Sequence, residues 1–206
     1  MNWLVVVLLI VVVLLVGWFV VTYNSLVGAR NRTQEAWSGI DVELKRRHDL
    51  IPNLVATVQG YAAHESGTLT AVTDARAAAV AAGSSGDPAK VGQAENMLSQ
   101  SLRSLFAVTE NYPDLKAVAA FTQLQADLTD TENKIEFARR FYNGNVRDFN
   151  SAVQSLPTAA IAGPLGFHAM AFFQPDSEAD RVAPQVSFGP PSAAPPPAAG
   201  PPPAAG

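Results

Sequence analysis

The side chains of this sequence that could do chemistry are few and widely spaced. His48 and His64 fall on one predicted helix, sixteen positions apart, and His168 lies far along the chain. That separation is about 24 Å along a helix axis, so the first two histidines cannot share a metal ion unless the chain reverses between them. Zinc ligands on a helix are spaced i, i+4, and no histidine pair has that spacing. We therefore predict no metal site, and we expect His64 and its neighbour Glu65 at the surface.

Two acids one helical turn apart, Glu132 and Glu136, form the other candidate pair. Such carboxylates occur in acid–base and di-iron sites, but a di-metal site in a bundle needs Glu-x-x-His pairs from facing helices. The sequence has none, so we interpret both as exposed acids. It also has no cysteine, no glycine-rich phosphate loop, no nucleophile elbow and no His-Glu-x-x-His motif. We predict a protein that is not an enzyme, with no cofactor and no catalytic or metal-binding residues.

Length and charge narrow the class of protein further. A chain of 206 residues fits one domain with appendages. Its formal net charge of -4 offers no basic excess to follow a phosphate backbone, so we predict no nucleic-acid partner.

The N-terminal residues 3–21 have no polar side chain, and a helix needs about 20 apolar residues to cross a membrane. Trp3 at one edge, with Trp18 and Tyr23 at the other, fits the aromatic residues found at membrane interfaces. A cleaved signal peptide is the alternative, with Val27-Gly28-Ala29 as its cleavage site. That interpretation lacks a positive n-region and would need a shorter apolar stretch. We therefore predict an uncleaved transmembrane anchor.

Basic residues near the span indicate its orientation, because short cytoplasmic flanks carry an excess of Lys and Arg. Only Met1 and Asn2 precede the span, whereas Arg30 and Arg32 follow it closely. We therefore expect the C-terminal domain to be cytoplasmic.

After the span, apolar residues recur with the spacing of a helix. A first soluble helix is predicted from Tyr23 to Ala82. Its seam comprises Trp37, Ile40, Leu44, Ile51, Leu54, Val58, Tyr61 and Val72, with Arg47, Glu65 and Thr68 as polar interruptions. Pro52 lacks an amide proton, and Asp49 is positioned to cap a new helix there. Because the seam keeps its phase across Pro52, we favour a kink at this residue over a reversal of the chain.

Two further helices are predicted. The second begins after Asp87-Pro88, a cap followed by proline, and ends near Glu110. Its seam comprises Val91, Ala94, Leu98, Ser101, Leu105 and Val108, widened by Leu102 and Phe106. The third follows a break at residues 111–114 and ends before Pro157. Its seam comprises Phe121, Leu124, Leu128, Thr131, Ile135, Ala138, Tyr142, Asn145, Phe149, Ala152 and Leu156.

The predicted fold is all-α. An N-terminal transmembrane helix precedes an antiparallel up-and-down bundle of three to four long helices, the first kinked near Pro52. Acid-before-base pairs four residues apart indicate solvated faces: Asp41 with Lys45, Glu43 with Arg47, Asp130 with Lys134, and Glu136 with Arg140. Polar residues on the seams can fix the register of a bundle at some cost in stability, and these are Arg47, Thr131 and Asn145.

Beyond Pro157 the pattern becomes irregular, with an apolar patch around Phe167, Met170, Phe172 and Phe173 that we expect to pack across the bundle or lie on the membrane. From Gly189 onward only Gly, Pro, Ala and Ser occur, which cannot offset their ordering entropy. We interpret this tail as a disordered spacer, with a proline-recognition ligand as the alternative. The predicted parts are an anchor (1–22), a bundle (23–157), an irregular segment packing on the bundle (158–188) and the tail (189–206).

Two long blocks resemble the LemA family. The first, YNSLVGARNRTQEAWSGIDVELKRRHDLIPNLVATVQGYAAHE, begins at Tyr23, and the second, LQADLTDTENKIEFARRFYNGNVRDFNSAVQSLP, covers residues 124–157. The resemblance implies a single-pass protein of the bacterial inner, or cytoplasmic, membrane with an antiparallel helical bundle and no enzymatic activity. No site residue carries over. The most recognisable residues are expected to build a buried polar network or an oligomer surface, and they are Trp37, Asp41, Lys45, Arg46, Arg47, Asp49, Pro52, Glu132, Arg139, Arg140, Tyr142 and Asn143.

Two functions remain open. The first is a scaffolding role, in which the anchor restricts the bundle to the membrane plane and favours self-association. The second is a membrane-tethered binding or sensory module that presents the groove between the first and third helices to a peptide, lipid or protein. The charged string from Lys45 to Asp49, next to an apolar seam, motivates the second. We therefore expect the membrane, a homo-oligomer and an unidentified protein as partners.

Overall fold

The structure, a computed structural model, describes residues 2–174, and every regular element in that part of the chain is a helix. The helices are α1 (Trp3–Gln59), α2 (Ser66–Gly83), α3 (Pro88–Thr109), α4 (Pro113–Lys116), α5 (Ala119–Gln154) and α6 (Ala159–Ala162). The all-α fold class is therefore confirmed. The predicted tail (189–206) and the later part of the predicted irregular segment (175–188) lie outside the described residues.

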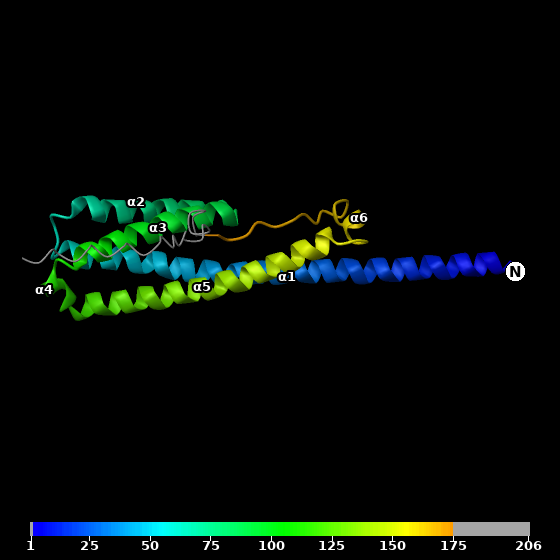
Figure 1. The fold of residues 1–206 in the computed structure, drawn as a ribbon, viewed down its shortest axis with the longest axis horizontal. Helices are drawn as coiled ribbons and strands as arrows, with labels where there is room; N and C mark the ends of the chain where they lie inside the picture. The colour runs from blue at the N-terminus through cyan, green and yellow to red at the C-terminus, as the bar shows by residue number, and fades with distance from the viewer. Residues whose placement is uncertain (1, 175–206) are drawn as a thin grey trace, which may run out of the picture.

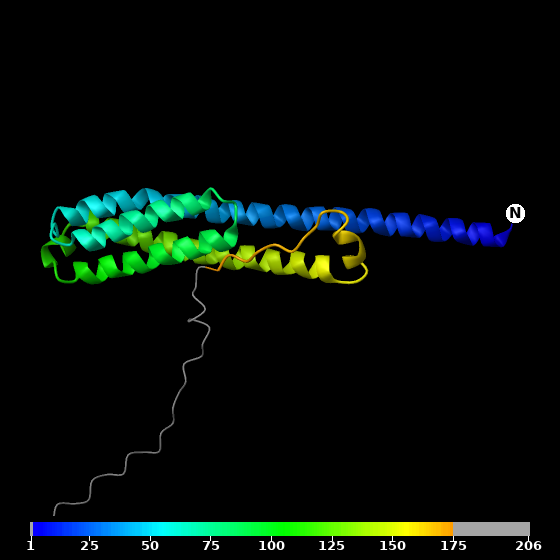
Figure 2. The same cartoon turned by 90° about the horizontal axis from the view of Figure 1, so that it is seen from above.

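The longest helix, α1, is the axis of the molecule. α5 runs antiparallel to α1 and packs closely against it, while α2 and α3 form a hairpin over the end of α1 that lies away from the N-terminus (Figures 1 and 2). The pairs α1–α5 and α2–α3 are the most closely packed, and α2 joins the two pairs through its contact with α1. These four helices form the predicted antiparallel bundle.

The first part of α1 extends beyond the bundle. In residues 3–21 large side chains such as Leu8 (63% exposed) and Leu14 (66% exposed) have no covering helix. By length and composition this segment could cross a membrane. The first buried side chain of the chain's described part is Leu26. A single helix therefore continues from the apolar segment into the bundle core.

The first soluble helix is shorter than predicted. α1 passes through Pro52 and ends at Gln59, and α2 begins after the chain reverses over residues 60–65 (Figure 1). The prediction of one helix as far as Ala82 was wrong. The three-and-four spacing of apolar residues keeps its phase across a turn, so spacing alone could not reveal the break. Tyr61, predicted in the seam, lies in this turn and is 50% exposed.

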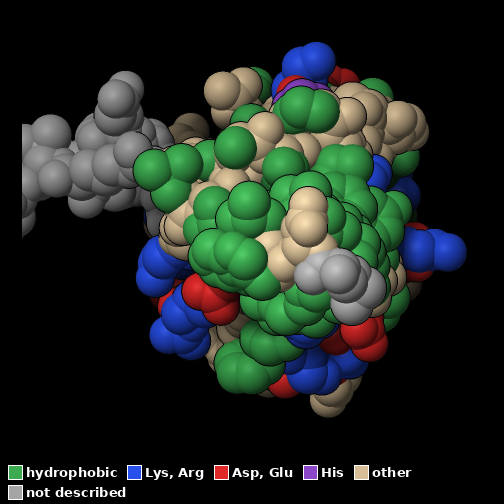
Figure 3. All heavy atoms as spheres, turned by 90° about the vertical axis from the view of Figure 1, so that its right-hand side faces the viewer, with side chains coloured by type: hydrophobic (Ala, Val, Ile, Leu, Met, Phe, Trp, Pro, Cys, Tyr) green, Lys and Arg blue, Asp and Glu red, His purple; other side chains and the backbone are tan. Residues whose placement is uncertain are grey.

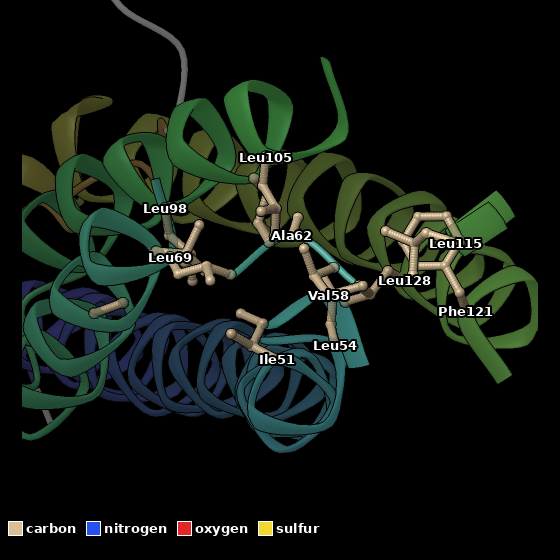
Figure 4. Close-up of a cluster of buried hydrophobic side chains, with 13 residues drawn as sticks. Ile51, Leu54, Val58, Ala62, Leu69, Leu98, Leu105, Leu115, Phe121 and Leu128 are labelled. Carbon is tan, nitrogen blue, oxygen red and sulfur yellow. The ribbon is translucent and has the colours of Figure 1, made fainter. Parts of the chain in front are cut away.

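Buried apolar side chains form three clusters along the bundle. The cluster farthest from the N-terminus comprises Ile51, Leu54, Val58, Ala62, Leu69, Val72, Ala79, Leu98, Leu102, Leu105, Leu115, Phe121 and Leu128 (Figure 4). The middle cluster comprises Ala36, Ile40, Leu44, Val91, Ile135, Tyr142, Val146 and Phe173. The cluster nearest the apolar segment comprises Leu26, Phe149, Ala162 and Phe167. Every cluster contains residues of α1, and each large side chain so buried contributes about 1.5–3 kcal/mol.

After α5 the chain turns back along the bundle. The short helix α6 lies beside α1 near the apolar segment, and residues 163–174 run from it along α5 (Figures 1 and 2). Phe167 and Phe173 of this stretch are buried. We expected the C-terminal apolar patch to pack across the bundle or to lie on the membrane, and these two side chains pack on the bundle.

Candidate functional site

A layer of polar side chains crosses the bundle between two apolar clusters. Arg47 of α1 is 2% exposed, and its guanidinium donates to Glu95 Oε2 of α3 at 2.8 Å and to Ser99 Oγ at 3.1 Å. It also donates to the Glu95 backbone carbonyl at 3.0 Å and to the carboxylate of Glu132 on α5. His48 Nε2 lies 2.7 Å from Glu95 Oε1. One arginine therefore ties three helices together.

This polar layer fixes how the helices align. Glu95 is as buried as Arg47, so both charges have lost their hydration. Such a pair adds little net stability, but removal of one partner leaves a buried charge and costs about 3–5 kcal/mol. On α1 the layer lies between Leu44 of the middle cluster and Ile51 of the far cluster. A slip of any of the three helices by one turn would separate the charges, so the layer specifies register.

Glu95 was absent from the predicted seam of the second helix. The structure buries Val91, Gly92, Glu95, Leu98, Leu102, Leu105 and Thr109 of α3. The predicted seam used Ala94 and Ser101, whereas the structure buries the residue that follows each of them, Glu95 and Leu102. Leu102 could have revealed this burial. Four residues before Leu102 is Leu98, and three residues before Leu98 is Glu95, which is the spacing of one helix face.

A side chain of α2 accommodates Pro52 in the middle of α1. In a regular helix the carbonyl of residue 48 accepts a hydrogen bond from the amide of residue 52, which proline lacks. Arg76 of α2 donates from Nε to the His48 carbonyl at 2.6 Å. The arginine replaces the missing backbone donor, so α1 continues through Pro52 without an unsatisfied carbonyl at this point.

Two asparagines of α5 hold residues 170–173 against the bundle. Asn143 donates to the Phe173 carbonyl at 2.9 Å and accepts from the Phe173 amide at 3.0 Å. Asn150 makes the same two bonds with Met170, at 3.0 and 2.8 Å. Each side-chain amide pairs with both backbone groups of one residue, as a neighbouring strand would. This face of α5 therefore binds polypeptide backbone.

Aromatic side chains hold the same segment from the inside. Tyr142 donates to the Ala171 carbonyl at 2.9 Å, and burial raises the pKa of Tyr142 to about 12. Trp37 of α1 meets the rings of Tyr142 and Phe173 edge to face, with centroids 5.3 and 5.5 Å apart. The segment thus bridges α5 and α1.

A groove with a volume of about 410 Å³ lies between α3 and α5. Its charged lining is Arg47, Arg103, Arg139, Glu132 and Glu136, and its apolar lining is Leu102, Phe106, Leu128 and Ile135. Residues 163–174 are called the C-terminal segment. The groove continues the path of this segment, because Gln174 lies against Gly92 of α3, one turn before the lining residue Asn96. We expected a groove between the first and third predicted helices. The groove described above lies between the second and third instead. A groove of about 390 Å³ is also lined by residues of α1 and α5, and its lining is Thr33, Gln34, Trp37, Ser38, Gly86, Pro88, Tyr142, Met170 and Ala171.

A second surface, the outer apolar face, consists of Val42, Phe137 and Phe141. Phe137 and Phe141 are one turn apart on α5 and are 69% and 59% exposed. Val42 of α1 is 66% exposed. Large exposed side chains of this kind are the usual anchors of protein interfaces when they cluster.

An ion-pair cluster between α1 and α5 flanks the outer apolar face. Arg46, one turn after Val42 on α1, lies 3.8 Å from the carboxylate of Asp130 on α5. Asp130 also pairs with Lys134 at 2.8 Å, and Lys134 precedes Phe137 by one turn. The hydrogen bond from Lys134, with the positive charges of Lys134 and Arg46, lowers the pKa of Asp130.

The other sequence-predicted residues divide between surface and core. Two predicted surface pairs are present, Asp130 with Lys134 at 2.8 Å and Glu136 with Arg140 at 3.6 Å. Arg47 turns inward rather than towards Glu43. His64 and His168 are exposed, whereas His48 is buried in the polar layer. Within residues 2–174 no group of three or more His, Cys, Asp or Glu side chains could hold a metal ion.

The residues that carry the family resemblance have distinct places. Arg47 is buried in the polar layer, where it meets the carboxylate of the exposed Glu132. Trp37, Tyr142 and Asn143 hold the C-terminal segment. The other residues of this set lie at the surface or are only partly buried, and they are Asp41, Lys45, Arg46, Asp49, Pro52, Arg139 and Arg140.

Comparison with known proteins identifies the family of this chain. The chain is 30% identical to Protein LemA of Metamycoplasma hominis over 161 residues, which cover 77% of this chain and 71% of that protein. It is 26% identical to Magnetosome protein MamQ 2 of Paramagnetospirillum magneticum and 25% identical to Magnetosome protein MamQ of Magnetospirillum gryphiswaldense, each over 80% of this chain and 70% of the relative. The pattern of the LemA family matches residues 36–188, which include the polar layer and the C-terminal segment. The chain belongs to the LemA family.

Proposed function

We propose that this chain is a scaffold anchored in the bacterial cell membrane by residues 3–21, and that copies associate side by side through the outer apolar face. The continuity of α1 carries the proposal, because one helix runs from the apolar segment into all three core clusters. A continuous helix sets the height of the bundle above the membrane. The role is structural and needs no catalytic residue.

Anchoring favours contact between equivalent faces. Copies in one membrane share the same orientation, so residues at one height meet across a twofold axis normal to the membrane. Val42 and Phe137 lie at similar heights, since Arg46 and Asp130 pair just beyond them. Confinement to a plane raises the effective concentration of the partner, so a small interface suffices.

Single cysteines test this contact, because the natural chain has none. We expect Val42→Cys to give a covalent dimer with a flexible bismaleimide in intact membranes. Val80→Cys is the matched control, since Val80 is also an exposed helical valine (45%) but belongs to α2. Phe137→Asp in the Val42→Cys background is expected to abolish the dimer. Equal cross-linking at both valines, or a dimer insensitive to Phe137→Asp, contradicts self-association through this face.

The expected orientation is part of the proposal. Arg30 and Arg32 follow the span, which favours a cytoplasmic bundle. A membrane-impermeant maleimide should therefore label Val80→Cys only after the cells are opened. Labelling in intact cells contradicts the cytoplasmic orientation.

A second function, binding of an extended peptide from a partner protein in the groove between α3 and α5, is favoured by one observation. The groove continues the face on which Asn143 and Asn150 already hold extended chain, and its lining offers the further amides Asn96 and Asn133. Arg103 of the lining is exposed, so it can pair with a carboxylate of an acidic peptide.

A photo-activated cross-linker tests the peptide groove. Placed at Asn133 in the full-length protein in native membranes, it should attach to one defined acidic segment of a second polypeptide, identified by mass spectrometry. Arg103→Glu should remove the product, and a cross-linker at Val80 should not form it. Attachment to residues 175–188 of the same chain would show that the protein fills its own groove, which contradicts the partner hypothesis.

A further inference from the structure

We propose that the α5–α6 corner, residues 155–165, enters the membrane interface beside the span and forms a second contact with lipid. The inference rests on the proposed membrane anchoring and adds to it. The contact would restrict the tilt of the bundle relative to the membrane, because two points of attachment leave less freedom than one.

The height of the corner follows from its neighbours on α1. Phe149 of α5 shares a cluster with Leu26 of α1, and the rings of Tyr23 and Phe167 meet with centroids 5.8 Å apart. α5 continues from Phe149 to Gln154 while the antiparallel α1 runs back by an equal length to about Val21. The corner therefore lies level with the last residues of the apolar segment, and α6 is beside that part of α1 in Figures 1 and 2.

The chemistry of the corner suits lipid. No Asp, Glu, Lys or Arg occurs between Phe149 and Phe167, although the rest of α5 is densely charged. Leu156 is 85% exposed, the highest value among the exposed large hydrophobic side chains. Its exposed neighbours in the corner include Pro157, Ala159, Ala160 and Pro164, and Ser155 is the exposed polar side chain among them. A leucine side chain that leaves water for lipid is stabilised by the hydrophobic effect.

Charged side chains begin just above this level. Arg30 and Arg32 of α1 and Arg147 of α5 are all exposed. Asp148 is the acid beside them. Figure 3, seen from the N-terminal end, shows hydrophobic side chains gathered at the centre with Lys, Arg, Asp and Glu towards the rim. An apolar end with arginines above it matches an acyl region below a layer of lipid phosphates.

The depth of insertion is limited by the backbone. Residues 155–158 turn sharply, and some of their backbone groups lack the regular bonds of a long helix. Unpaired backbone groups are excluded from the hydrocarbon core. The corner therefore lies at the interface, about 5–10 Å into the headgroup and acyl boundary, as interfacial helices do.

Fluorescence quenching by spin-labelled lipids measures this depth. The probe is an environment-sensitive dye on single cysteines of the full-length protein, in vesicles of phosphatidylcholine and phosphatidylglycerol. Leu156→Cys reports the corner and Val12→Cys the span. Phe137→Cys, on the same helix and also exposed (69%), reports the bundle. We expect lipids labelled near the headgroup to quench the dye at Leu156→Cys, lipids labelled deep in the chain to quench Val12→Cys, and neither to quench Phe137→Cys.

The outcomes separate the inference from the anchor on which it rests. Quenching at Val12→Cys without quenching at Leu156→Cys overturns the interfacial corner and leaves the anchor intact. The absence of quenching at both positions overturns the anchor and the corner together. Quenching at Phe137→Cys also contradicts the inference, because the bundle would then lie flat on the membrane.

Discussion

At the scale of residues, the polar layer around Arg47 constrains the register of the helices most strongly. The arginine reaches α3 and α5 at once, and its Nε has no hydrogen-bond partner among the described residues. The carboxylate of Glu95 accepts a hydrogen bond from Arg47 and lies within hydrogen-bond distance of His48. The layer therefore depends on Glu95 more than on the solvent-exposed Glu132.

Glu95→Gln is expected to lower the free energy of unfolding by about 3 kcal/mol, because the buried guanidinium loses its main charged partner. Thermal or denaturant unfolding of the full-length protein in detergent, followed by circular dichroism, measures the change. Glu136→Gln removes the same charge from a surface pair on α5, and it should change stability by less than about 1 kcal/mol. Equal effects of the two variants would contradict the role of the buried layer.

The partnership between Pro52 and Arg76 also belongs to this scale. Arg76→Ala leaves the His48 carbonyl unsatisfied and is expected to cost about 1–3 kcal/mol. In the Pro52→Ala background the amide of residue 52 supplies the missing donor, so the cost of Arg76→Ala should shrink. A double-mutant cycle measures this coupling. An unchanged cost of Arg76→Ala in both backgrounds would show that the arginine acts otherwise.

At the scale of elements, the C-terminal segment behaves as a fifth component of the bundle. A Cβ at Gly92 would lie 2.9 Å from the carbonyl oxygen of Gln174. Gly92→Ala should therefore displace the segment and accelerate amide hydrogen exchange at Phe173. Gly39→Ala is the matched control, because nothing lies within 4 Å of that position. The control should leave exchange at Phe173 unchanged and stabilise α1 by about 0.5–1 kcal/mol. Unaltered exchange in Gly92→Ala would contradict close contact with α3.

The bond from Tyr142 to this segment makes its attachment sensitive to high pH. The pKa of Tyr142 is raised from 10.0 to about 12, so the folded state favours the neutral hydroxyl. The resulting stability is complete below pH 10 and is lost as pH rises through about 12. Ultraviolet difference titration of the wild type against Tyr142→Phe should show tyrosinate forming near pH 12. Ionisation of Tyr142 near pH 10 would mean that the ring is not buried against the segment.

The sequence predicts the elements unequally. The pattern of α5 predicts its buried face well, since Phe121, Leu128, Ile135 and Phe149 are all buried. It fails at Asn145, where the neighbouring Val146 is buried instead. The turn over residues 60–65 escaped prediction because periodic spacing reports which face of a helix is apolar, and not whether the chain reverses between two helices.

At the scale of the whole molecule, the apolar segment and the helical bundle could be predicted, because both depend on local composition and spacing. The groove could not, because its place depends on which helices pack closely. The pairing of Arg47 with Glu95 could not either, since a seam reveals that a polar residue is buried but not its partner. The membrane contact proposed for the α5–α6 corner could not be predicted from the sequence, because it depends on the height of the corner beside α1.

Alkaline carbonate extraction of native membranes, followed by intact-mass measurement, tests the anchored bundle most directly. We expect the protein to stay in the membrane pellet with its N-terminal residues present. A variant lacking residues 2–21 should become soluble and keep a helical circular dichroism spectrum. Full-length protein released by carbonate, or a mature chain that begins beyond Tyr23, would contradict the account.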